Sequence, residues 1–163
     1  MVRIQLFDVN GTKKRVYENL VPVGALRHGD GTNQDIASNQ LVQFFLRTFF
    51  RRRPALFPRG SARTSVFLLD GKVGDQTVTG ISRFQSFAQR SGIPVLQDSR
   101  VSVANGVNVP GSGNRWTIHA LNSFFLADEG QAAFDTLFAN REIVAEAPEL
   151  AAELIREEQL LRS

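Results

Sequence analysis

The sequence predicts a mainly α-helical protein that begins with a β-hairpin and ends with a helical extension. Three observations lead to this prediction. Apolar and polar residues alternate in the first ten residues and lead into an Asn-Gly turn. Farther along, apolar residues recur at helical spacing, with helix-capping residues at the ends of those stretches. The chain closes with an acidic stretch whose apolar residues again follow a helical period.

The hairpin is predicted over residues 1–20. Val2, Ile4 and Leu6 alternate with polar residues, and Asn10-Gly11 supplies the positive φ angles of a two-residue type I′ turn. An isolated hairpin is marginally stable in water, so this one is expected to lie on its own domain or on a neighbouring chain. These residues and the Gly- and Pro-rich loop predicted after them form an N-terminal arm, residues 1–34.

The first long helix is predicted from about Asp35 to Phe50, with Asn33 or Asp35 as its N-cap. Its apolar residues fall at helical spacing and end in a Phe pair, Phe49 and Phe50. A basic loop broken by two prolines follows. A short apolar run, residues 65–69, then connects this loop to the next turn.

The second helix is predicted to begin at Asp75 as its N-cap and to end near Gly92, a residue suited to the position after a helix. Gly71 and Gly74 are expected to allow a sharp turn before it. Gly80 lies within the helix at a cost of about 1 kcal/mol relative to Ala, and close helix–helix approach is the expected reason. Its predicted buried stripe is Thr77, Ile81, Phe84 and Ala88.

The third helix is predicted over about residues 114–126, with Asn114 as its cap. Two acidic helices are then predicted near residues 129–141 and 148–161, in a C-terminal extension that covers residues 127–163. Pro148 stands where the first turn of a helix tolerates proline.

The segment from Asp70 to Gln85 reads DGKVGDQTVTGISRFQ. It resembles the D-G-x-F-G-x-x-T-x-x-A-V-x-x-F-Q signature of the first type of peptidoglycan-binding-like domain, with Val73 in place of the usual Phe and Gly80 in place of the usual Ala. Three weaker similarities flank it: residues 41–46 are similar to that family's V-x-x-L-Q-x-x-L helix, 92–95 to its G-L-x-V turn and 117–122 to its T-W-x-A-L-N helix.

The resemblance covers about residues 35–126. It implies a three-helix bundle and binding to bacterial peptidoglycan, usually beside the catalytic domain of a wall hydrolase. Residues 1–34 and 127–163 are too short to form such a catalytic domain. Two segments depart from the family pattern, namely the Arg-rich loop after the first helix and residues 96–115, which replace a short D-G-x-x-G turn.

The resemblance also nominates five residues for ligand binding: Asp70, Gly71, Gly74, Thr77 and Gln85. One interpretation is that these residues only shape the turn, since Asp and Thr side chains bond nearby backbone amides. The other is that the turn contacts glycan or stem peptide.

An arginine cluster forms a second candidate site: Arg51, Arg52, Arg53, Arg59 and Arg63. Arginine forks match phosphate oxygens, and Phe residues are interleaved, so nucleic acid is one possible partner. A protein interface is the favoured alternative, and the chain's own acidic helices could also pair with the cluster.

Catalytic and metal-binding signals are weak. The chain has no Cys, which excludes disulfides, thiolate zinc sites and a Cys nucleophile. His28 and His119 lack metal-ligand spacing, and no G-x-S-x-G elbow or phosphate loop occurs. The two glycines of GSGNRW, residues 111–116, precede a predicted helix and are a weak anion-site signal. We therefore expect no enzyme activity, cofactor or metal.

Charge is distributed unevenly along the chain. Residues 1–100 hold 15 basic and 7 acidic residues, a balance of +8, whereas residues 101–163 hold 4 and 9, a balance of −5. This contrast suits packing against a second copy or a charged partner, and the alternative is two solvated faces of one domain. The final segment carries Leu150, Leu154, Ile155 and Leu161 on one predicted helix face. That face is expected to dock either on its own core or on a neighbour.

Two functions from different classes follow. The favoured one is a structural subunit of a larger particle, such as a phage or phage-tail-like injection device, with protein subunits as its partners. The other is a peptidoglycan-binding module, and nucleic-acid binding is a minor third. The N-terminus has no signal-peptide core and no window approaches 18 uninterrupted apolar residues, so cytoplasmic synthesis and no membrane partner are expected.

Overall fold

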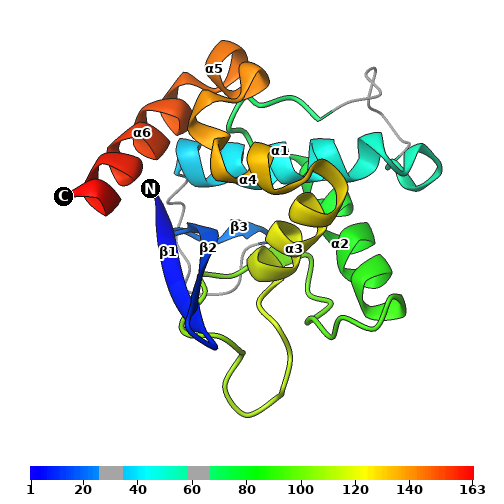
Figure 1. Ribbon diagram of the computed structural model, residues 1–163. Helices are drawn as coiled ribbons and strands as arrows, with labels where there is room; N and C mark the ends of the chain where they lie inside the picture. Colours follow the sequence, from blue (N-terminus) through cyan, green and yellow to red (C-terminus); the bar gives the residue numbers. More distant parts are fainter. Residues whose placement is uncertain (26–34, 59–66) are drawn as a thin grey trace.

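The computed structural model describes residues 1–25, 35–58 and 67–163. The described part is mainly α-helical with an N-terminal hairpin, as predicted. Helix α1 (Ile36–Arg51) crosses the middle of the molecule, and the other helices and the hairpin surround it (Figure 1). Every α1 residue from Ala37 to Phe50 is buried, so this helix is the centre of the core.

The predicted hairpin is confirmed. Strand β1 (Val2–Val9) pairs antiparallel with β2 (Thr12–Asn19), and the turn residues Asn10 and Gly11 have φ angles of 52° and 81°. The end of the hairpin near the chain terminus packs on its own domain, where Tyr17 is buried together with the first residues of β1.

A second, very short sheet was not predicted. Strand β3 (Val23–Gly24), in the loop predicted after the hairpin, pairs antiparallel with β4 (Arg100–Val101), in the segment 96–115 that departs from the family pattern. Two residues per strand carry no periodicity, so a sequence pattern could not signal this pairing.

The helix caps agree with the predictions in part. Asp35 caps α1, since its carboxylate accepts the Ser38 N–H at 3.1 Å. Asp75 is not a cap but the first residue of α2 (Asp75–Arg90), and Gly74 precedes it. Asn114 is not a cap either, because Arg115 is held in isolated β-bridges and α3 (Thr117–Glu129) begins only after Trp116.

Of the three glycines singled out in the sequence, Gly71 has its predicted role, whereas Gly74 and Gly80 differ from the predictions. Gly71 has a φ of +73°, and a Cβ there would lie 2.6 Å from Ile36 Cγ2, so this turn requires glycine. Gly74 has an extended φ of −117° and open space around it, so its predicted role in the turn is wrong. At Gly80 a Cβ would lie 2.5 Å from the Phe67 ring, so the close approach is to that ring rather than to another helix backbone.

Helices α1, α2 and α3 contribute to one hydrophobic core. The expected core residues Phe45, Ile81, Phe84 and Leu121 are all buried within it. The same core continues into the hairpin and into the C-terminal helices. Residues from all three segments distinguished in the sequence therefore share one interior.

The helix predicted at residues 129–141 is not continuous. The chain there forms α4 (Gln131–Asp135), a 3₁₀ turn (Leu137–Ala139) and α5 (Arg141–Glu146). Gly130, at a φ of 90°, ends α3, and the Asn140 side chain accepts the Glu142 and Ile143 N–H groups at the start of α5. Turn and cap residues thus divide the segment.

The last helix, α6 (Pro148–Arg162), lies close to its predicted bounds and docks on its own chain. Leu150 and Leu154 are fully buried against the core, whereas Ile155 is 44% exposed. The buried face follows the i, i+4, i+8 row that ends at Glu158, so the expected burial of Ile155 is wrong. No helix in the described ranges is long and apolar enough to cross a membrane.

Candidate functional site

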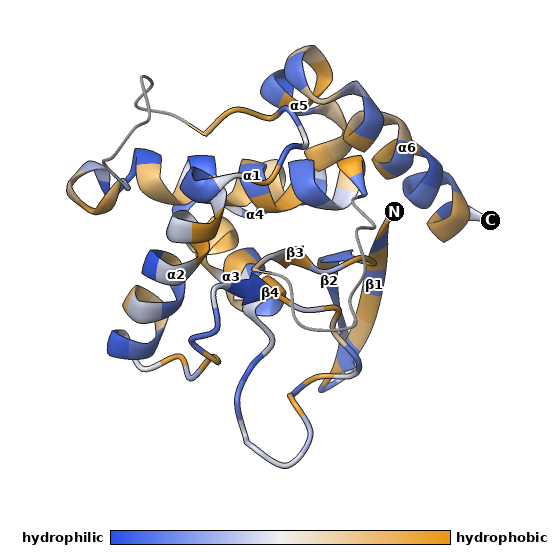
Figure 2. Cartoon of the chain, turned by 180° about the vertical axis from the view of Figure 1, so that it is seen from behind, coloured by the Kyte–Doolittle hydropathy of each residue, from blue (hydrophilic) through white to orange (hydrophobic). Residues whose placement is uncertain are grey.

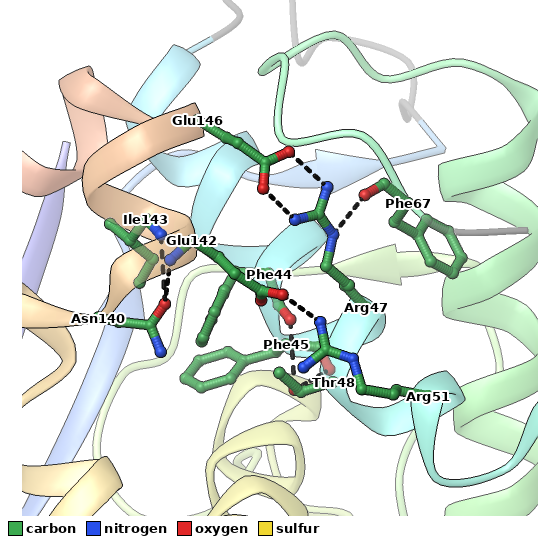
Figure 3. Close-up of polar contacts among 10 residues, drawn as sticks. All are labelled: Phe44, Phe45, Arg47, Thr48, Arg51, Phe67, Asn140, Glu142, Ile143 and Glu146. Atoms are coloured by element: carbon green, nitrogen blue, oxygen red, sulfur yellow. Dashed lines mark hydrogen bonds and ion pairs between the residues drawn. The ribbon is translucent and has the colours of Figure 1, made fainter. Parts of the chain in front are cut away.

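The arginines at the end of α1 are paired with acidic residues of the same chain. Arg51 pairs with Glu142, Arg52 with Glu129 at 2.5 Å, and Arg53 with Asp128 at 2.7 Å. One helical turn earlier, Arg47 binds both oxygens of Glu146 at 2.7 and 2.9 Å and also donates to the Phe67 carbonyl (Figure 3). The hydrogen bond from Arg47 lowers the pKa of Glu146 below its ordinary value.

Arg53 contacts aromatic rings as well as the Asp128 carboxylate. Its guanidinium lies over the rings of Phe49, Phe87 and Phe124, at 4.3, 5.2 and 5.3 Å from their centroids. Such cation–π contacts orient the side chain against α2 and α3. Of the aromatics near the cluster that suggested a nucleic-acid surface, Phe49 therefore packs against an arginine within the fold.

The arginine candidate site is thus occupied in large part by the chain itself. Arg51, Arg52 and Arg53 each have an acidic partner from residues 128–142, which is one of the alternatives that the sequence left open. Arg59 and Arg63 lie outside the described residues, as do Asn33 and His28. An external phosphate would have to compete with carboxylates already in place.

The turn that opens α2 is organised by Gln43 of α1. The Gln43 amide donates to Asp70 Oδ1 and to the Lys72 carbonyl at 3.3 and 2.8 Å, and it accepts the Gly71 N–H at 3.0 Å. The Thr77 hydroxyl is also within 3.5 Å of this amide. Three of the nominated residues therefore meet around one buried glutamine, while the side chains of Asp70 and Lys72 remain exposed.

Gln85 does not belong to that turn. It is fully buried on α2, where its amide donates to the Arg100 carbonyl at 2.9 Å and accepts the Ser99 N–H at 2.9 Å. It also donates to Thr117 at the start of α3 at 3.1 Å. This side chain joins α2, β4 and α3, and a ligand has no access to it.

A His–carboxylate cluster lies between the hairpin and α3, and no sequence pattern pointed to its carboxylate. His119 Nε2 is 3.3 Å from Glu18 Oε2, and Arg3 Nε is 3.3 Å from Glu18 Oε1. Burial alone would raise the pKa of Glu18, but the hydrogen bonds from His119 and Arg3 hold it below its ordinary value. His119 thus joins α3 to β2. In residues 1–25, 35–58 and 67–163, no group of three or more His, Asp or Glu residues could hold a metal ion.

Both edges of the hairpin are covered at the end near the chain terminus. On the β1 edge, carboxylates of α6 accept backbone N–H groups: Glu153 from Val2 at 2.7 Å and Glu157 from Ile4 at 3.1 Å. On the β2 edge, the Asn122 amide bonds both the N–H and the carbonyl of Tyr17, each at 2.8 Å. These side chains make the hydrogen bonds that a neighbouring strand would make.

Among the residues that the structure describes, none covers the edges of the distal half of the hairpin in this way. This half extends away from α6 in both views (Figures 1 and 2). Leu6 and Val9 are 37% and 41% exposed, and Lys13 and Lys14 are exposed on β2. Sequence alternation placed Leu6 in the hairpin but could not show which part of each edge is covered.

Three comparisons with known proteins found no relative of this chain. A scan against models of protein families, a search of curated proteins and a search of solved structures each found no match.

Proposed function

We propose that this protein is a non-catalytic assembly subunit that joins its neighbours through the distal half of its β-hairpin. A larger particle, such as a phage or phage-tail-like device, is the setting that we propose for it. The helical core would be a peptidoglycan-binding-like three-helix bundle adapted to a structural role.

One observation supports this proposal most directly. Within residues 1–25, 35–58 and 67–163, the hairpin edges are covered by α6 and Asn122 only near the chain terminus, and the distal half projects with exposed apolar side chains. Native proteins usually protect strand edges, because an uncovered edge is a template for pairing with another chain. The acidic tail, by contrast, no longer argues for assembly, since its apolar face is buried on its own core.

Sedimentation velocity over a wide protein concentration range tests the proposal. The wild-type protein should form species larger than a monomer at high concentration. Leu6→Glu should weaken this association, because it places a charge on the exposed apolar part of the hairpin. Leu96→Glu is the matched control, since Leu96 is similarly exposed but lies outside the hairpin. A wild-type protein that stays monomeric at every concentration would contradict assembly through the hairpin by copies of this chain.

Peptidoglycan binding is the second candidate. The specific observation in its favour is the turn before α2, where Asp70, Lys72 and Gly74 are exposed on a backbone held by Gln43. Co-sedimentation with insoluble peptidoglycan should then exceed that of an equally basic control protein, a control that the sequence pI of about 9.9 makes necessary. Asp70→Ala should reduce it, whereas Thr79→Ala, an exposed change on α2, should not. Equal sedimentation of the wild type and the control protein would exclude this function.

A further inference from the structure

We infer that two copies of this chain pair antiparallel through their β1 edges, with Phe7 at the two-fold axis. This inference rests on the proposed assembly function and deepens it by naming the partner and the register.

The first step is to identify the outward-facing groups of β1. In an antiparallel pair, successive residues point their backbone groups alternately toward the partner strand and away from it. The N–H groups of Val2 and Ile4 point away from β2, since they donate to Glu153 and Glu157. Leu6 and Asp8 continue this outward series. Within the described residues, no hydrogen bond from outside the hairpin reaches the backbone of either.

The uncovered stretch fixes the register. Pairing Leu6 with Asp8 of a second copy satisfies the outward N–H and carbonyl groups of both residues in both copies, and it forms four hydrogen bonds. The next pair would match Ile4 with Asn10, but the Ile4 N–H is already bound to Glu157 and Asn10 lies in the turn. The pairing therefore ends where the cover by α6 begins. It is self-complementary, as a two-fold interface requires.

Charge distinguishes the two edges of the hairpin. The same self-pairing on β2 would place Lys13 opposite Arg15 and Lys14 opposite its own copy, and like charges directly opposite each other are destabilising. On β1 the facing pairs are Leu6 with Asp8, Phe7 with Phe7 and Gln5 with Val9, and none carries like charges. The β1 edge can thus pair with a second copy without facing like charges, whereas like charges oppose such pairing on the β2 edge.

A proline substitution tests the hydrogen bonds. Leu6→Pro removes an N–H that points away from β2, a position where an edge strand tolerates proline. Leu6→Thr is the matched control, since it also removes the apolar side chain but keeps the N–H. By symmetry Leu6→Pro removes two hydrogen bonds, so the dimer dissociation constant should rise about tenfold to hundredfold. Leu6→Thr should change it far less, and circular dichroism should show both variants folded.

A cysteine substitution tests the register. The chain has no Cys, so Phe7→Cys introduces a single thiol, and the proposed axis brings two copies of it within the span of a disulfide. Mild oxidation should give a covalent dimer of Phe7→Cys. Gln5→Cys is the control, because two copies of residue 5 would lie about 13 Å apart along the strands and should not cross-link.

The outcomes separate this inference from the proposed function. Association that persists in Leu6→Pro, or cross-linking of Gln5→Cys as readily as Phe7→Cys, would overturn the pairing while leaving assembly by another surface in place. A wild-type protein that is monomeric throughout would overturn both. Loss of association in Leu6→Pro but not in Leu6→Thr, together with selective cross-linking at residue 7, would support the pairing.

Discussion

Tyr17 is the only tyrosine of the chain, and residues of α3 and α4 contact it. It is 1% exposed, its hydroxyl donates to the Phe134 carbonyl of α4, and its backbone is held by Asn122 of α3. Its ring packs edge-on against Phe134 at a centroid distance of 5.1 Å. One residue of the hairpin thereby joins α3 and α4.

Burial raises the pKa of Tyr17 to about 12, so its ionisation should be delayed in the folded state. Since the folded pKa exceeds the unfolded value of about 10, this contribution to stability is fully present below pH ~10 and is lost as the pH rises through ~12. Absorbance at 295 nm should follow this single tyrosine. A midpoint near that of the protein in denaturant would contradict the buried position, and Tyr17→Phe should abolish the signal.

Phe84 shows what one buried ring contributes. It is fully buried on α2, between the rings of Phe49 and Phe124 at 4.9 and 5.5 Å. Phe84→Ala should lower the free energy of unfolding by about 3–5 kcal/mol. Arg83→Ala, at the exposed neighbouring position, should lower it by much less. Urea denaturation measures both, and a loss below about 1 kcal/mol for Phe84→Ala would show that the site is not part of the core.

At the scale of elements, α6 has two functions in the fold. Its apolar face fills the core through Leu150 and Leu154, and Glu153 and Glu157 cover the β1 edge. A helix of this length is marginal alone, so its packing stabilises it. The same helix thereby limits the part of β1 that another strand could reach.

Two adjacent residues test the docking of α6. Leu154→Ala should lower the free energy of unfolding by about 2–5 kcal/mol, because it leaves a cavity at a fully buried site. Ile155→Ala, at the 44% exposed neighbour, should cost less than about 1 kcal/mol. Thermal and urea unfolding should give the same order. Equal losses would mean that α6 does not present this face to the core.

At the scale of the molecule, the uneven charge is matched inside the chain. All nine acidic residues of 101–163 contact groups of the first hundred residues. Five pair in close contacts with arginines of α1, of the two residues that follow it, or of β2, and Asp135 lies 3.9 Å from Arg15. The remaining three accept from Gln40 and from the β1 backbone. The acidic residues of 101–163 therefore pair with groups of residues 1–100 within the fold, and this charge contrast no longer requires an external partner.

Acid should weaken the fold through these carboxylates. The pKa values of Glu146 and Glu149 are lowered by hydrogen bonds from Arg47 and Gln40, and that of Glu18 is lowered despite its burial. Lowered pKa values stabilise the fold above the unfolded value of about 4.3, and this contribution is lost as the pH falls below it. Urea unfolding at neutral pH and below pH ~4 should show the loss, and Glu18→Gln should reduce its size. Stability that does not change with pH would contradict this account.

Elements with strong local signals could be predicted from the amino-acid sequence. The Asn10-Gly11 turn, the Asp35 cap, the buried stripe of α2 and the extent of α6 all follow from neighbouring residues, and the structure has each of them. Periodicity and turn chemistry act over a few residues, which is why a single sequence reveals them. The helical spacing of apolar residues likewise predicted a mainly α-helical chain, which the structure has.

The contacts between these elements became known only from the folded structure. The pairing of β3 with β4, the burial of Gln85, the contact of Glu18 with His119 and the matching of Arg51–Arg53 with acidic residues all join segments far apart in the chain. A residue type shows what a side chain can bond but not which group will face it after folding. For that reason the candidate sites could be nominated from the sequence, whereas the covered and uncovered halves of the hairpin edge could be distinguished only once α6 and Asn122 had been placed beside it.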